Sequence, residues 1–106
     1  MKICIYGTGA IGGLIAAWLA RSGHEVSLIA RGAQLEAIRT GGLRVRDRAS
    51  GKTEAFSLTV DADPARLGAQ DYVIVAVKAQ NLTQVAAGIA PLLSKDTSIV
   101  TAMNGV

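Results

Sequence analysis

The sequence predicts an α/β domain in which a mostly parallel sheet is doubly wound and covered by helices on both faces, giving three layers. Short apolar runs alternate with stretches of helical periodicity along the 106 residues. A glycine-rich turn separates the first run from the first helix. Residues 72–77 are apolar throughout, as in a strand covered on both faces. The length fits one domain.

The glycine-rich turn is the most informative local feature. It follows an apolar strand at residues 3–6 and precedes a helical pattern that stops at Gly23. Its GxGxxG spacing provides a tight turn, close approach of a phosphate to the backbone, and close packing of helix on strand. The helix N-terminus adds free N–H groups that attract an anion. We therefore expect the pyrophosphate of a dinucleotide to be held by Gly7, Thr8, Gly9, Ala10, Ile11 and Gly12.

Two other interpretations of this stretch stay open. The glycines could serve packing alone, or Lys2 and the apolar run could begin a targeting segment, although glycines interrupt that run. After the turn, large apolar side chains recur at helical spacing, which predicts a helix. This stripe consists of Ile11, Leu14, Ile15, Trp18 and Leu19.

The middle of the chain predicts a strand, a helix and the two arms of an inserted hairpin, at residues 26–30, 33–40, 43–48 and 56–60. Two glycines close the helix. In the first arm Arg44, Arg46 and Arg48 alternate with apolar residues, which predicts an antiparallel strand with a solvated arginine face. The second arm can run on into the third parallel strand.

The second half of the chain predicts a helical turn, a buried strand, a helix and a last strand, at residues 63–68, 72–77, 82–93 and 98–102. Asp63 is placed to cap the turn, with proline at the first helical position. Asn81 and Gln84 have the spacing of an N-cap and its N3 partner. Pro91 should bend or end the helix.

Composition limits the classes of function. Half of the residues are apolar and 18% are charged, with a formal net charge of +3. This modest charge suits an anionic small molecule, and no aromatic residues interleave with the arginines as nucleic-acid binding would favour. One cysteine, Cys4, excludes an internal disulfide and favours a reducing compartment, so we expect the cytoplasm. No apolar run is long enough for a membrane span, and no metal-ligand cluster is visible.

Four features fall at the carboxyl ends of predicted strands, where open parallel sheets bind their ligands. They are the glycine turn, Arg31, Lys78 and Asn104. NAD-binding units usually carry an acid at the position of Arg31, to bind the ribose 2′-hydroxyl. An arginine suits a 2′-phosphate instead, so we expect NADP(H). The alternative is an exposed arginine that opens a loop.

Lys78 and Asn104 are the candidate catalytic residues. Lys78 could orient a substrate carbonyl or carboxylate or relay a proton, or it could be a surface lysine at the sheet edge. Asn104 offers a donor and an acceptor beside a nicotinamide, or it could form an Asn-Gly turn. Both residues could also contact the cofactor. With the glycine turn and Arg31 they would outline one groove.

Together these motifs resemble the N-terminal Rossmann-type domain of ketopantoate reductases (2-dehydropantoate 2-reductases), in the 6-phosphogluconate-dehydrogenase-like group. The motifs GTGAIGG, Ala30-Arg31-Gly32, Ala76-Val77-Lys78 and Met103-Asn104-Gly105 occur in family order over the entire chain. The resemblance implies an oxidoreductase that uses NADPH to reduce 2-dehydropantoate to pantoate, on the route to pantothenate and coenzyme A. It places Lys78 and Asn104 near the nicotinamide and the substrate. Met103 departs from the family, which often has glutamine there.

The resemblance also implies a helical C-terminal domain that supplies the principal lysine acid and closes the cleft. Residues 1–106 would then be an incomplete NADP-binding domain, a fragment or truncated product that is nearly inactive alone. Two alternatives stay open: a non-catalytic NADP(H)-binding module, and a related reductase of another 2-keto acid or of an imine. The expected partner is a small 2-keto acid. An exposed sheet edge could also pair with another copy in a homo-oligomer.

Overall fold

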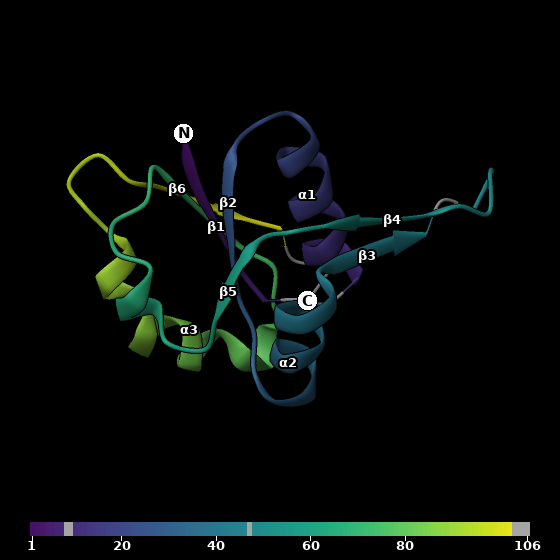
Figure 1. The fold of residues 1–106 in the computed structure, drawn as a ribbon. Coiled ribbons are helices and arrows are strands. Elements are labelled where there is room, and N and C mark those ends of the chain that lie inside the picture. The colour runs from purple at the N-terminus through teal and green to yellow at the C-terminus, as the bar shows by residue number, and fades with distance from the viewer. Residues whose placement is uncertain (8–9, 47, 103–106) are drawn as a thin grey trace.

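The computed structural model of the chain describes residues 1–7, 10–46 and 48–102 (Figure 1). Its elements are β1 Lys2–Tyr6, α1 Ala10–Arg21, β2 Glu25–Ile29, α2 Gly32–Gly41, β3 Leu43–Arg46, β4 Thr53–Phe56, β5 Thr59–Asp61, β6 Tyr72–Val75, α3 Leu82–Gly88 and β7 Ser98–Thr101. Short 3₁₀ turns occupy Pro64–Arg66, Ala79–Asn81 and Ala90–Leu92.

The main sheet is parallel and has the strand order β5-β2-β1-β6-β7. The chain therefore starts at the centre, winds outward through β2 to β5, and then returns to place β6 and β7 on the other side of β1. The switch in winding direction lies between β1 and β6. This is the doubly wound Rossmann-type arrangement that the alternation of apolar runs predicts.

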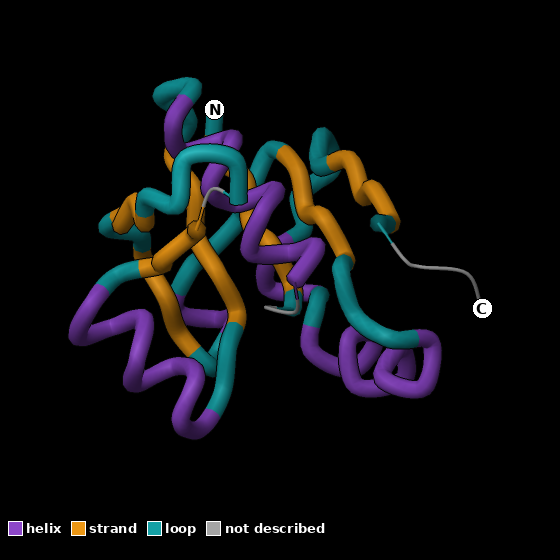
Figure 2. Tube along the Cα trace, turned by 90° about the vertical axis from the view of Figure 1, so that its right-hand side faces the viewer, coloured by secondary structure: helices purple, strands orange, loops and turns teal. Residues whose placement is uncertain are grey.

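Helices cover the two faces of the sheet, as the two views of the chain show (Figures 1 and 2). On one face, Ile5 of β1 packs in a cluster with Ala16 and Ala17 of α1, together with residues of α2 and β3. On the other face, Cys4 packs in a cluster with Val85 of α3 and residues of the 3₁₀ turns. Adjacent residues of β1 serve opposite faces because side chains alternate along a strand.

The apolar stripe of α1 is only partly buried. Ile15 and Leu19 pack against the core, but Leu14 is 42% exposed and Trp18 is 58% exposed. Ala16 and Ala17 of the same helix are almost fully buried. Small side chains therefore hold the positions of α1 that lie deepest in the core.

The predicted hairpin forms between β3 and β4, with Leu43 opposite Phe56. Its returning arm is Thr53–Phe56, and Thr59–Asp61 is a separate strand, β5, that pairs in parallel with β2. The arginines at positions 44 and 46 are exposed, as predicted. The hairpin forms a two-stranded sheet of its own that packs against α1, and β5 is the strand that joins the main sheet.

The second half of the chain also differs in detail from the prediction. The carboxylate of Asp63 accepts the backbone N–H of Ala65 at 3.0 Å, which confirms the predicted cap. Helix α3 ends before Pro91, as expected. Strand β7, by contrast, is exposed on both faces, including Ile99 and Val100, because it lies at the edge of the sheet.

Candidate functional site

A cavity of about 510 Å³ lies beyond the carboxyl ends of β1, β2 and β6. This is the edge at which doubly wound sheets bind ligands, because the chain changes direction there. We call it the edge cleft. The residues that line it include Tyr6, Gly7, Arg31, Gln34, Lys78 and Gln84. Three of the four predicted features of the groove therefore meet in one cleft.

Gly7 joins β1 to the edge cleft in a conformation that only glycine adopts easily, with φ of 113°. A Cβ atom at this position would lie 2.6 Å from the carbonyl oxygen of Ala76 and 2.7 Å from Cγ1 of Val77. The N–H of Ala76 in turn donates to the carbonyl of Tyr6 at 2.9 Å. The ends of β1 and β6 are thus bound together where the chain turns.

Gly12 brings helix α1 against the end of β1. A Cβ atom there would overlap the carbonyl oxygen of Gly7 and lie 3.3 Å from Cβ of Ala76. The predicted close packing of the helix on the strand is therefore confirmed. Helix α1 begins at Ala10, three residues after Gly7, so its N-terminus lies next to the cleft.

Arg31 lies two residues beyond the end of β2, and its side chain is exposed. Its Nη2 donates to Oε1 of Gln84 on α3 at 2.6 Å. Within the described ranges no ion pair involves this guanidinium. Burial raises the pKa of the Tyr6 hydroxyl, and the positive charge of Arg31 opposes that rise. The cleft therefore contains a cation whose charge is not neutralised by a carboxylate.

The neighbouring strand β5 ends on an acid, Asp61, but its carboxylate is turned to its own loop. Oδ1 of Asp61 accepts the backbone N–H of Asp63 at 2.9 Å. This hydrogen bond, with smaller contributions from the charges of Arg66 and Arg39, holds the pKa of Asp61 below its ordinary value. Asp61 does not line the edge cleft.

Lys78 lies on the other side of the edge cleft from β2, just after β6. The strand ends at Val75, two residues earlier than predicted, and the chain then passes along the cleft before it turns. The carbonyl of Lys78 accepts the N–H of Asn81 at 2.8 Å, and its side chain is exposed. The lysine is therefore placed at the cleft by a 3₁₀ turn.

The remaining predicted site residues lie outside what the structure describes. These are Thr8, Gly9 and Asn104, together with the side chains of Ala10 and Ile11. The departure at Met103 also falls in this group. Their roles stay predictions.

Amide side chains are the part of the cleft that sequence reasoning missed. Gln34, Gln80, Asn81 and Gln84 all line it. Asn81 and Gln84 occupy the predicted N-cap and N3 positions of α3, but Asn81 makes no side-chain cap bond and Gln84 accepts from Arg31. The signal that could have revealed them is their position at the first turns of helices that follow strand ends.

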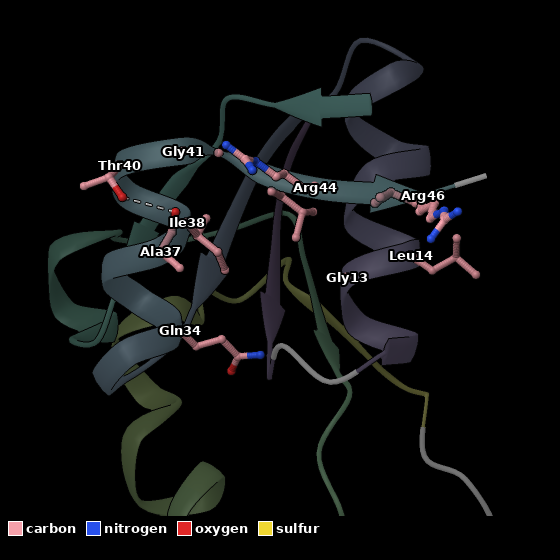
Figure 3. A pocket seen from close by; sticks show the side chains of 12 residues that line it. Gly13, Leu14, Gln34, Ala37, Ile38, Thr40, Gly41, Arg44 and Arg46 are labelled. Atoms are coloured by element: carbon pink, nitrogen blue, oxygen red, sulfur yellow. Dashed lines mark hydrogen bonds between the residues drawn. The ribbon is translucent and has the colours of Figure 1, made fainter. Parts of the chain in front are cut away.

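A second and larger cavity, of about 710 Å³, lies between α1, α2 and β3 (Figure 3). Its lining includes Leu14 and the two exposed arginines of β3, and Gln34 borders both cavities. Figure 3 shows Arg44 pointing toward Gly41, and its guanidinium would lie 3.3 Å from a Cβ atom there. This cavity is away from the carboxyl ends of the strands, so the edge cleft remains the candidate site.

In the part of the chain that the structure describes, no group of His, Cys, Asp or Glu side chains could hold a metal ion. No helix among those residues is both long enough and apolar enough to cross a membrane.

Fold and site together define a class: a Rossmann-type α/β domain with a glycine turn and an arginine at the edge where such sheets bind ligands. Comparison with known proteins narrows this. Residues 3–106 match the family model of ketopantoate reductase PanE/ApbA. The chain belongs to the ketopantoate reductase family.

Relatives and solved structures agree with this membership. The chain is 50% identical to the 2-dehydropantoate 2-reductase of Mesorhizobium japonicum, over all of this chain and 32% of that protein. A PanE/ApbA family ketopantoate reductase from Ralstonia eutropha matches with a TM-score of 0.89 and 34% identity, over 99% of this chain and 35% of that one. A D-mandelate dehydrogenase in a complex with NADH and anilino(oxo)acetate has a TM-score of 0.85 and 31% identity, over 100% of this chain and 34% of that one. The chain spans about a third of the length of these oxidoreductases.

Proposed function

We propose that this chain is the cofactor-binding part of a reductase that uses NADPH to convert 2-dehydropantoate to pantoate. The observation that carries the proposal is Arg31, which stands beyond the end of β2 and is paired with no carboxylate among the residues that the structure describes. A guanidinium in that position suits the ribose 2′-phosphate that distinguishes NADPH from NADH. The named activity of the relative from Mesorhizobium japonicum supports the substrate.

The residues of the edge cleft fit a dinucleotide. The close contacts at Gly7 and Gly12 hold the start of α1 against the end of β1, so the free N–H groups of the helix N-terminus would face a pyrophosphate bound in the cleft. The bound nicotinamide would supply hydride to the keto carbon of the substrate. Lys78 and Asn104 would lie near the nicotinamide and orient the keto acid, and a lysine would protonate its oxygen.

A second function has specific support. The similar D-mandelate dehydrogenase holds NADH and a 2-oxo acid analogue, so this fold also accommodates NADH and other 2-keto acids. The chain could therefore belong to a reductase of another 2-keto acid. A non-catalytic NADP(H)-binding module is the remaining alternative, and measurable turnover of 2-dehydropantoate by this chain would exclude it.

The test is titration of the chain with NADPH and with NADH, for the wild type, Arg31→Ala and Arg48→Ala. Arg48 is an exposed arginine near the hairpin turn that does not line the edge cleft, so it controls for loss of surface charge. We expect the wild type and Arg48→Ala to bind NADPH more tightly than NADH, and Arg31→Ala to lose this preference. Equal affinity of the wild type for both cofactors would refute the NADPH assignment.

A further inference from the structure

We propose that Gln84 is a positioning residue: it fixes the direction of the Arg31 guanidinium and so sets how strongly the edge cleft prefers a ligand with a ribose 2′-phosphate. The contact joins the end of β2 to helix α3 across 53 positions of sequence, and its N···O distance is 2.6 Å. This inference rests on the proposed function, because it assumes that Arg31 is the group that meets the 2′-phosphate.

A guanidinium at an exposed position needs such a partner to be ready for a ligand. The arginine side chain has several rotatable bonds, and holding it in one geometry costs conformational free energy that binding would otherwise have to supply. The carbonyl of Gln84 accepts from one Nη2 hydrogen, while the guanidinium has five N–H donors in total. The remaining donors stay available to an anion.

The chemical nature of the partner matters as much as its place. A carboxylate at this position would hold Arg31 equally well but would also neutralise its charge. The amide of Gln84 is neutral, so it orients the guanidinium and leaves its positive charge for the ligand. This is a different task from the helix capping that the sequence spacing indicates, since no cap bond is made at the start of α3.

The position of Gln84 is fixed by its neighbour in the helix. Val85 is 5% exposed and packs in the core cluster on this face of the sheet. Because Val85 anchors the first turns of α3, the backbone of Gln84 is held at the cleft, although its own side chain is exposed. The contact to Arg31 therefore starts from a rigid element.

The experiment measures the Kd of NADPH and of NADH for the wild type, Gln84→Met, Gln84→Glu and Thr83→Ala. Methionine keeps the length of the side chain but cannot accept the hydrogen bond in the same way. We expect Gln84→Met to weaken NADPH binding about three- to tenfold, the usual range for one hydrogen bond, and to leave NADH binding unchanged. Thr83 is the exposed neighbour that does not line the cleft, so Thr83→Ala should bind both cofactors as the wild type does.

Gln84→Glu separates orientation from charge. It keeps an acceptor for Arg31 but adds a carboxylate that competes with the 2′-phosphate, so it too should weaken NADPH binding and spare NADH binding. Arg31→Ala could remove the wild-type preference for NADPH while both Gln84 variants keep it. That result would overturn the role of Gln84 and leave the assignment of Arg31 in place. Equal wild-type affinity for the two cofactors would overturn the assignment of Arg31, and the role of Gln84 with it.

Discussion

Two adjacent glycines in α1 give a matched test of how closely the helix packs against the end of β1 at the glycine turn. A Cβ atom on Gly12 would overlap the carbonyl oxygen of Gly7, whereas on Gly13 the nearest atom is Cδ1 of Leu43 at 3.7 Å, an ordinary contact. Both glycines are helical, where alanine is intrinsically preferred by about 1 kcal/mol. Gly12→Ala and Gly13→Ala therefore share the same propensity and differ in what the new methyl group meets.

The structure gives opposite signs for the two variants. Gly13→Ala should raise the free energy of unfolding by about 0.5–1 kcal/mol, since only propensity changes. Gly12→Ala forces a methyl group against backbone that cannot swing aside, and overpacking of this kind costs about 1–3 kcal/mol. After the propensity gain of about 1 kcal/mol is subtracted, we expect Gly12→Ala to lower the free energy of unfolding by about 0–2 kcal/mol. For a domain of this size the two melting temperatures should differ by on the order of 10 °C.

Urea unfolding followed by far-ultraviolet circular dichroism measures both free energies, with thermal melts as a second measure. Titration with NADPH measures whether displacement of the helix also lowers the affinity for NADPH. We expect this loss of affinity for Gly12→Ala only. If Gly12→Ala proved as stable as Gly13→Ala, α1 would be free to move away from β1. The close approach at Gly12 would then not fix the turn, and the reasoning would be wrong.

Other residues give further predictions. Burial raises the pKa of the Cys4 thiol from 9.0 to about 11, and the Ser27 hydroxyl opposes this rise. Between these two pKa values only the unfolded thiol ionises, so the free energy of unfolding should fall as the pH rises. Cys4→Ala should lessen that fall. The lowered pKa of Asp61 means that its ionised carboxylate stabilises the fold above the ordinary carboxyl pKa, and this stabilisation is lost on acidification. Asp61→Asn should therefore make the free energy of unfolding depend less on pH between neutral and about pH 3. Asp63→Ala should cost about 0.5–1 kcal/mol in urea unfolding through loss of its cap. Glu54→Gln should change stability by less than about 1 kcal/mol, because its 2.7 Å ion pair with Arg21 is exposed.

The order of elements and the place of the cleft follow from local patterns in the sequence. Apolar runs such as residues 72–77 identify strands, and the alternation with helices leaves few ways to arrange a parallel sheet. Once the strands are known, Gly7, Arg31 and Lys78 must meet at one edge. The structure bears this out, since all three line the edge cleft.

The role of Gln84 could not be predicted, because the same spacing serves two purposes. An amide three residues after Asn81 can complete a capping pair or reach toward the cleft, and both are compatible with the sequence. What decides is the position of Arg31, which lies 53 residues earlier and is brought near only by the fold. Local patterns carry no information about such a partner.

The exposed face of α1 has a different cause, one that connects the surface of the domain to its site. Periodicity shows that large apolar residues share one side of a helix, but not how closely the helix approaches the sheet. Here Gly12 lies against the carbonyl of Gly7 at the start of α1, Ala16 and Ala17 are buried under the helix, and Leu14 and Trp18 remain exposed. The same contact places the start of α1 beside the edge cleft, where its free N–H groups can meet an anion. The exposed apolar side chains and the start of α1 at the cleft thus both depend on how closely α1 approaches β1, so a methyl group at position 12 should disturb both together.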